Sequence, residues 1–225
     1  MNMAWSWCLP EFVSSIIDDM YAGSKLVVLI SGNGSNLQAL LDACASGELP
    51  GQVVAVISNK GDAYGLERAR QAGVSAVHKP KIKQQDRREY DSELAEQVAS
   101  FQPDWIILAG WMRVLTSSFL DVFPGRVINL HPALPGTFPG VEAIQRAYEA
   151  YQKGEIQQTG VMVHLVPDEG IDAGPVLAQQ VVPIFPQDSL ETLEARIHIV
   201  EHELLVKTLR RVLTEPDFVR SRIHA

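Results

Sequence analysis

Two polar side chains end an apolar segment near the middle of the chain. Residues 126–132 read RVINLHP, so Asn129 and His131 lie two positions apart. Side chains at that spacing point to the same side of a β-strand, and polar groups at the end of a buried strand need hydrogen-bond partners or a function. An amide beside an imidazole can donate hydrogen bonds and exchange protons, so the pair is a candidate catalytic site.

A carboxylate is the natural third member of such a site, and Asp172 is the candidate. It lies in the segment 167–175, which reads PDEGIDAGP. An aspartate before Ala-Gly-Pro is also typical of a plain turn, and the sequence pattern leaves that interpretation open.

A glycine-rich turn, SGNGSN at residues 31–36, follows the apolar run KLVVLIS and precedes a helix-like segment. Unpaired N–H groups and the helix dipole at such a turn suit a phosphate. A tight turn without a ligand is the alternative. A dinucleotide fold fits poorly, because the third glycine position holds Leu37 and the second strand ends in Ser58-Asn59. A Walker A loop is excluded, because no Gly-Lys-Ser/Thr follows.

Alternating strands and helices must position these residues. Continuous apolar runs predict strands buried on both faces, and 3.6-residue periodicity predicts the helices between them. We expect an α/β fold: one doubly wound, mostly parallel sheet with helices on both faces and a C-terminal antiparallel strand pair. The predicted strands cover residues 25–31, 52–58, 105–110, 126–130, 160–166 and a run after Gly174. One predicted helix begins near Leu37, and the others cover residues 64–72, 86–101 and 189–214.

The sequence predicts one domain with an N-terminal extension. Residues 1–24 are expected to form a short amphipathic helix, with apolar residues from Phe12 to Met20, docked on the body or on a partner subunit. Residues 25–225 form the predicted catalytic domain.

Composition narrows the class of protein. The chain has 225 residues, a formal net charge of -8 and two cysteines, Cys8 and Cys44. The acidic balance disfavours nucleic-acid binding, and no apolar run is long enough for a membrane span. With no signal-peptide pattern, we expect a cytoplasmic protein.

Four motifs in order resemble the folate-dependent phosphoribosylglycinamide formyltransferase family of purine synthesis. They are SGNGSNLQALLDA (31–43), AGWMRVL (109–115), NLHPALPGTFPG (129–140) and DEGIDAGPVLAQ (168–179). The similarity runs from about Lys25 to about Leu213. It implies the formyltransferase fold and transfer of the formyl group of 10-formyltetrahydrofolate, as co-substrate, to the amine of glycinamide ribonucleotide. A formyltetrahydrofolate deformylase or another folate-dependent formyltransferase is the alternative.

The resemblance also implies the roles of individual residues. It implies that no metal is needed and that the protein is a monomer or a homodimer. Catalysis falls to Asn129, His131 and Asp172, and the substrate phosphate to Gly34, Ser35 and Asn36. Glu201 corresponds to a residue that holds the rest of the nucleotide. The folate contacts correspond to Arg87, Met112, Arg113, Val114, Leu115, Asp168, Glu169, Gly170 and Ile171.

The implied chemistry needs hydrogen-bond donors where the formyl oxygen becomes negative. We expect Asn129 Nδ2 and a protonated His131 to be these donors, with Asp172 keeping the imidazole charged and relaying protons. Two features depart from the family pattern: Ala133 stands where a serine is common, and the loop before Asp172, with Gly170 in it, is longer. Their effect on folate binding is not predicted.

Overall fold

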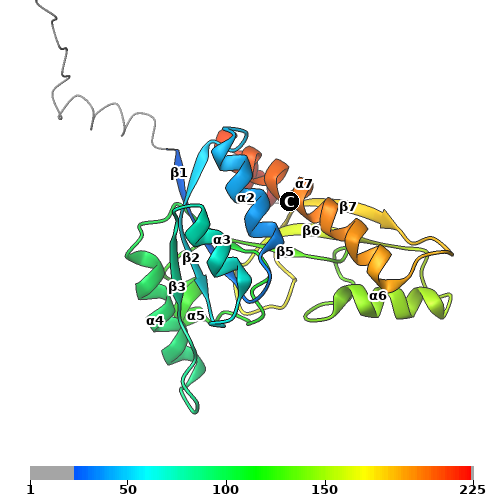
Figure 1. Ribbon diagram of the computed structural model, residues 1–225, viewed down its shortest axis with the longest axis horizontal. Helices are drawn as coiled ribbons and strands as arrows, with labels where there is room; N and C mark the ends of the chain where they lie inside the picture. Colours follow the sequence, from blue (N-terminus) through cyan, green and yellow to red (C-terminus); the bar gives the residue numbers. More distant parts are fainter. Residues whose placement is uncertain (1–22, 224–225) are drawn as a thin grey trace, which may run out of the picture.

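A seven-stranded sheet runs through the described part of the chain, residues 23–223 of this computed structural model (Figure 1). Its strand order is β3-β2-β1-β4-β5-β6-β7. The first five strands are mutually parallel, whereas β6 runs antiparallel to β5 and β7 antiparallel to β6. The predicted fold class is therefore confirmed. The strands are β1 (Ser24–Ile30), β2 (Gly51–Ser58), β3 (Ser75–His78), β4 (Trp105–Leu108), β5 (Val127–His131), β6 (Gln158–Leu165) and β7 (Val176–Pro183).

Helices cover both faces of the sheet and bury a separate core on each. The side chains of β1 alternate between these cores: Leu26, Val28 and Ile30 join one, and Val27 and Leu29 join the other. The first core is closed by α2, α3 and α7, and the second by α4 and α5. The helices are α2 (Ser35–Ala45), α3 (Tyr64–Gln71), α4 (Arg87–Ala99), α5 (Ser117–Leu120), α6 (Ala143–Gln152), α7 (Leu190–Thr214) and α8 (Phe218–Ile223).

Several elements differ from the predicted ones. The edge strand β3 and the helices α5, α6 and α8 were not predicted. The strand expected to end at residue 110 ends at Leu108, because Gly110 has a positive φ of 81° and its carbonyl accepts a hydrogen bond from the N–H of Ser31 instead. That turn lays residues 110–112 beside the glycine-rich turn. The predicted N-terminal helix, Phe12 to Met20, falls outside the described residues.

The carboxyl ends of β1, β4 and β5 meet at one edge of the sheet, as parallel order requires. The loop between β6 and β7 returns to this edge, where Asp172 contacts Asn129. No helix within residues 23–223 is both long and apolar enough to cross a bilayer.

Candidate functional site

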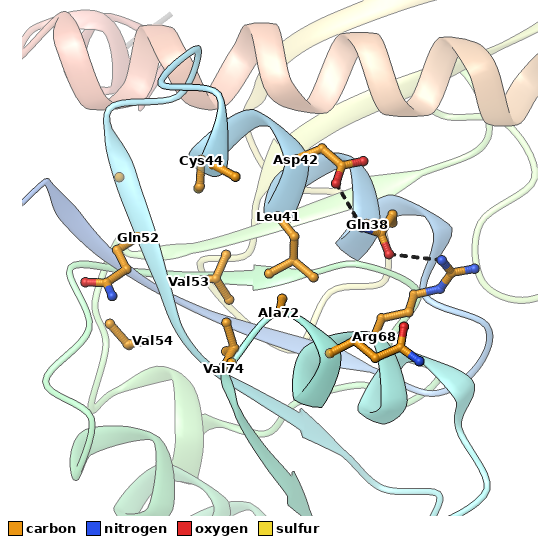
Figure 2. Close-up of a pocket in the computed structure, with 14 residues that line it drawn as sticks. Gln38, Leu41, Asp42, Cys44, Gln52, Val53, Val54, Arg68, Ala72 and Val74 are labelled. Atoms are coloured by element: carbon orange, nitrogen blue, oxygen red, sulfur yellow. Dashed lines mark hydrogen bonds between the residues drawn. The ribbon is translucent and has the colours of Figure 1, made fainter.

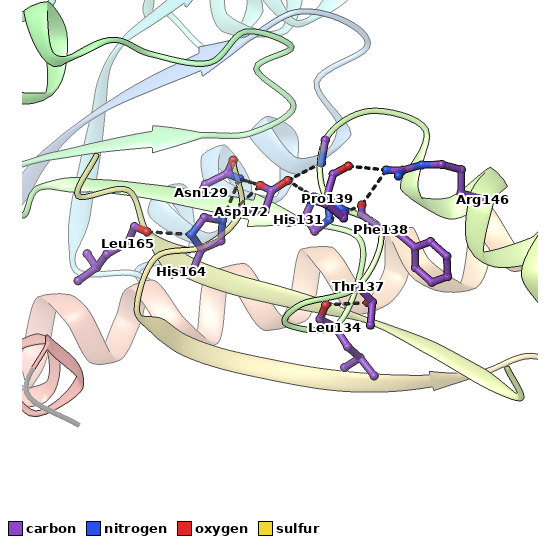
Figure 3. A network of polar contacts seen from close by, with 11 residues as sticks. Asn129, His131, Leu134, Thr137, Phe138, Pro139, Arg146, His164, Leu165 and Asp172 are labelled. Atoms are coloured by element: carbon purple, nitrogen blue, oxygen red, sulfur yellow. Dashed lines mark hydrogen bonds and ion pairs between the residues drawn. The ribbon is translucent and has the colours of Figure 1, made fainter. Parts of the chain in front are cut away.

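Asn129 and His131 lie at the end of β5, and both side chains contact Asp172 (Figure 3). Asn129 Nδ2 donates to Asp172 Oδ1 at 3.0 Å, and His131 Nδ1 lies 3.3 Å from Asp172 Oδ2. The structure thus brings the three predicted catalytic residues together. The side chains of His131 and Asp172 are only 5% and 10% exposed, so their interactions are little screened by water.

The backbone of the loop before α6 also binds the carboxylate. Gly140 N–H donates to Asp172 Oδ2 at 2.7 Å. Asp172 itself has a φ of 52°, a left-handed conformation that aspartate and asparagine adopt more readily than other side chains. Both carboxylate oxygens are therefore held by donors, which fixes the orientation of the group.

Burial sets the pKa of His131. It lowers the pKa of this imidazole, and the raising effects of the Asp172 charge and the Phe138 carbonyl do not offset it. The expectation that Asp172 keeps His131 charged is therefore wrong for the free protein: the pKa lies below its ordinary value. Burial disfavours the imidazolium more than one carboxylate favours it.

Asp172 behaves in the opposite way. Burial raises the pKa of its carboxyl group. The lowering effects of His164, the N–H of Gly140 and His131 together are larger than this rise. The net shift is downward, so Asp172 is ionised at neutral pH.

A second histidine, His164 on β6, completes the cluster and was not predicted from the sequence. It pairs with Asn129 across the β5–β6 ladder, and its Nε2 lies 3.1 Å from Asn129 Nδ2 and 3.5 Å from Asp172 Oδ1. Its Nδ1 lies 2.8 Å from the Leu165 carbonyl, which can only accept, so this nitrogen carries a hydrogen. A buried histidine inside the run VMVHLV was the available signal.

In this state the side-chain N–H groups of the site already face acceptors within the protein. The two hydrogens of Asn129 Nδ2 face Asp172 and His164, and His131 Nε2 lies 3.1 Å from the Phe138 carbonyl. An incoming oxyanion must therefore compete with internal acceptors for these donors.

The glycine-rich turn presents uncapped N–H groups, as a phosphate site requires. Gly34 is the N-cap of α2 with a φ of 77°, and no side chain caps the helix. Ser35 and Asn36 lie inside the first turn, so neither of them is the N-cap. A Cβ on Gly34 would lie 2.8 Å from Gly65 Cα, so the turn also packs tightly on α3.

Arg68 of α3 braces this turn from outside. Its guanidinium donates to the carbonyl and the side-chain oxygen of Asn33, both at 3.0 Å, and to Gln38 Oε1 at 3.0 Å. The last contact is seen in Figure 2, at the edge of a groove of about 740 Å³ between α2, β2 and α3. That groove holds none of the predicted site residues, and we assign it no role.

Glu201, on α7, lies at the other end of the turn. Its side chain is 6% exposed, and its Oε2 is 2.7 Å from His198 Nδ1 and 3.4 Å from the donating Asn36 Nδ2. The Glu201 contact is the first cause of a raised His198 pKa. Asn36 Oδ1 is buried with no partner among the described residues, so an acceptor is left for a ligand donor.

Two cavities meet at these residues. One of about 530 Å³ is lined by residues 31–36 and Glu201, and one of about 160 Å³ by Asn129, His131 and Asp172. They share a boundary at Gly110, Met112, Leu130 and Pro132. The arrangement offers an anion site and a polar catalytic cluster on either side of one junction.

The smaller cavity contains most of the residues expected to contact folate. Met112, Arg113, Val114, Leu115, Gly170 and Ile171 line it. Arg87 approaches from α4, where its Nη2 donates to the Val114 carbonyl at 2.8 Å.

Asp168 and Glu169 do not line this cavity. Asp168 accepts from Gly170 N–H at 2.8 Å, and Glu169 accepts from Ser117 N–H at 3.0 Å and from Arg88 at 3.2 Å. Both acids hold the loop that carries Asp172. Within residues 23–223, no group of three or more His, Cys, Asp or Glu side chains is arranged to hold a metal ion.

Comparison with known proteins gives a consistent result. The family model described as Formyl transferase matches residues 24–209. Phosphoribosylglycinamide formyltransferase of Schizosaccharomyces pombe is 46% identical over 207 residues, 85% of this chain and 98% of that protein. The Escherichia coli protein of the same name is 46% identical over 181 residues, 80% of this chain and 82% of its own length.

A solved structure also shares the fold. The crystal structure of glycinamide ribonucleotide transformylase 1 from Symbiobacterium toebii aligns with a TM-score of 0.80 and 41% identity, covering 85% of this chain and 88% of that one. Both the sequence and the architecture therefore match those of phosphoribosylglycinamide formyltransferases.

Proposed function

The chain belongs to the phosphoribosylglycinamide formyltransferases of the formyl transferase family, and we propose that it transfers the formyl group of 10-formyltetrahydrofolate to the amine of glycinamide ribonucleotide. The products are formylglycinamide ribonucleotide and tetrahydrofolate. The observation that carries this proposal is the cluster of Asn129, His131 and Asp172 at the junction of an anion-binding cavity and a second, partly apolar one.

The larger cavity is suited to the ribonucleotide. The N–H groups at Gly34, Ser35 and Asn36 bind the phosphate, because they are uncapped and lie at the positive end of α2. Glu201 is a buried acceptor at the same cavity and binds hydroxyl or amine donors of the substrate. The glycinamide amine then reaches the junction near Met112.

The smaller cavity is suited to the folate. Met112 and Ile171 line this cavity and are 58% and 52% exposed, so both offer apolar surface on which a flat heterocycle can pack. Arg87, at the N-terminal end of α4, is placed to bind a carboxylate of the folate tail. Asp168 and Glu169 act indirectly, by holding the loop.

The reaction exchanges one C–N bond for another. The amine lone pair attacks the formyl carbon and the carbonyl electrons move onto its oxygen. Asn129 and His131 donate hydrogen bonds to that oxygen, which requires them to leave the internal acceptors described above. The bond to the folate nitrogen then breaks, and its electron pair remains on that nitrogen.

Asp172 moves the proton that this exchange requires. It is ionised and next to both donors, so it accepts a proton from the attacking amine and passes it to the leaving folate nitrogen. A neutral His131 has one hydrogen for two facing acceptors. As negative charge grows on the formyl oxygen, a second hydrogen on the His131 ring becomes more favourable.

An assay of folate product with and without glycinamide ribonucleotide tests the proposal. We expect tetrahydrofolate to form only when the ribonucleotide is present, with formylated ribonucleotide in equal amount. A deformylase would instead release tetrahydrofolate and formate at the same rate without it, and that result would refute the proposal.

A further inference from the structure

Arg146 of α6 donates hydrogen bonds to the same loop backbone that the His131 ring contacts (Figure 3). Its Nη2 donates to the carbonyl of Phe138 at 2.8 Å and to that of Pro139 at 2.7 Å. The same Phe138 carbonyl lies 3.1 Å from His131 Nε2. One carbonyl oxygen therefore receives donors from the catalytic histidine and from an arginine that does not touch the histidine in this state.

The segment they share has an unusual backbone. Phe138 has a φ of 47° and Gly140 a φ of 81°, with Pro139, whose ring fixes a negative φ, between them. A phenylalanine rarely adopts the left-handed region, so external contacts must hold it there. The contacts are Arg146 on the two carbonyls and Asp172 on the N–H of Gly140.

His131 must change partner during the proposed reaction. To donate Nε2–H to the formyl oxygen, it has to leave the Phe138 carbonyl. The Phe138 carbonyl is part-buried, so the loss of a donor there would add to the activation barrier. Arg146 removes the cost, because it remains on Phe138 when His131 departs.

We propose that Arg146 is a positioning residue for His131: it holds the Phe138–Pro139 carbonyls in place and satisfies them when the imidazole turns to the substrate. This inference rests on the proposed formyl transfer.

The charge of Arg146 also affects the pKa of His131. The charged and titratable groups facing His131 are Asp172 from the β6–β7 loop, His164 from β6 and Arg146 from α6. Burial and then His164 lower the pKa of His131, and Arg146 lowers it by a smaller amount. Its removal therefore raises that pKa.

Arg146→Met is the direct test, because it keeps an unbranched apolar stem and removes both charge and donors. We expect kcat to fall by up to about tenfold, the effect of one unsatisfied, part-buried acceptor, while KM for glycinamide ribonucleotide stays within about twofold. The limb of the pH–rate profile that reports His131 should move to higher pH. Arg146→Lys keeps the charge and an ammonium donor group, and should restore most of kcat and return the limb.

Arg126→Met is the matched control. Arg126, at the other end of β5, also donates to two backbone carbonyls, those of Pro103 and Val122, and both lie away from His131. We expect a similar loss of stability but an unchanged pH–rate profile. An unchanged kcat and profile in Arg146→Met, or equal effects in the two methionine variants, would overturn the proposal.

NMR titration of the His131 ring without substrates separates this inference from the proposed function. A higher His131 pKa in Arg146→Met than in the wild type supports the contact even if another formyl acceptor is the true substrate. An identical pKa in both proteins refutes the positioning role even if glycinamide ribonucleotide is formylated.

Discussion

Asp172 is the residue on which the site converges, since Asn129, His131, His164 and the N–H of Gly140 all face its carboxylate. We expect Asp172→Asn and His131→Ala each to lower kcat by a factor on the order of 10² or more. KM for the ribonucleotide should change little, because the phosphate turn is untouched. Steady-state kinetics at saturating folate measure both constants. Undiminished turnover in either variant would contradict the assigned roles.

The protonation of His131 gives a second prediction at this scale. Its pKa lies below the ordinary value because burial outweighs the neighbouring carboxylate. Asp172→Asn removes the favourable charge, so the His131 pKa should fall further. Titration of the ring proton by NMR from acid to neutral pH measures the shift. A pKa that rises in this variant would show that the Asp172 charge does not favour the imidazolium.

The sequence predicted part of this cluster. The two-residue spacing of Asn129 and His131 identified the pair, because alternation on a strand is a local property. His164 and Arg146 could not be found in that way. Each joins the cluster through tertiary contacts: His164 through antiparallel pairing of β6 with β5, and Arg146 through α6 packing over the loop.

At the scale of elements, the turn into α2 depends on one glycine. Gly34→Ala combines a positive φ with a Cβ 2.8 Å from the backbone of Gly65, whereas a Cβ on Gly32 meets nothing within 4 Å. We expect Gly34→Ala to raise KM for the ribonucleotide about tenfold or more and to lower the Tm. Gly32→Ala is the control and should leave the Tm near that of the wild type. Equal KM values in the two variants would argue against phosphate binding at Gly34.

The entry into α7 is fixed by a buried ion pair. The Asp188 side chain is 3% exposed, and its oxygens accept from Arg196, from Thr192 and from the N–H of Phe185. Arg196 is the first cause that lowers the Asp188 pKa, to about 2. We expect Asp188→Asn to cost about 1–3 kcal/mol of unfolding free energy at neutral pH.

The pH dependence of that cost follows from its sign. A carboxyl whose pKa is lowered on folding stabilises the protein above its unfolded value, near 3.8, and loses this effect as the pH falls toward about 2. The difference between wild type and Asp188→Asn should therefore be constant above about pH 5 and shrink below it. Denaturant unfolding at several pH values measures it, and a difference that grows in acid would contradict the assignment.

Helices and strands were predicted where their patterns are strong. The helix α6 was missed because it follows a Pro- and Gly-rich loop and starts at Glu142 in a left-handed conformation, without a side-chain cap. The strand β3 was missed because its four residues, two exposed and two half-buried at a sheet edge, show no apolar run.

For the whole molecule, the prediction of a catalytic domain from residue 25 onward can be tested by truncation. The two described cores are built by residues from Leu26 onward, and the family match begins at residue 24. A chain that begins at Gly23 should fold with a Tm within a few degrees of the full chain and retain kcat. Thermal unfolding and the formylation assay measure both. Loss of kcat at an unchanged Tm would instead assign residues 1–22 to the catalytic unit.

The overall architecture was predictable because the buried parallel strands are continuous apolar runs. The approach of residue 172 to residues 129 and 131 was not, because it depends on the return of a long loop between β6 and β7. The sequence pattern offered Asp172 as a candidate but left a plain turn open, and the family resemblance implied its catalytic role.

The left-handed backbone at position 172 has a practical consequence. Asparagine tolerates this conformation nearly as well as aspartate, so the charge can be removed while the loop keeps its shape. The Asp172→Asn variant should bind both substrates without converting them to products. Crystals of it grown with the intact pair would trap the complex before bond exchange and give the distance between nucleophile and formyl carbon directly.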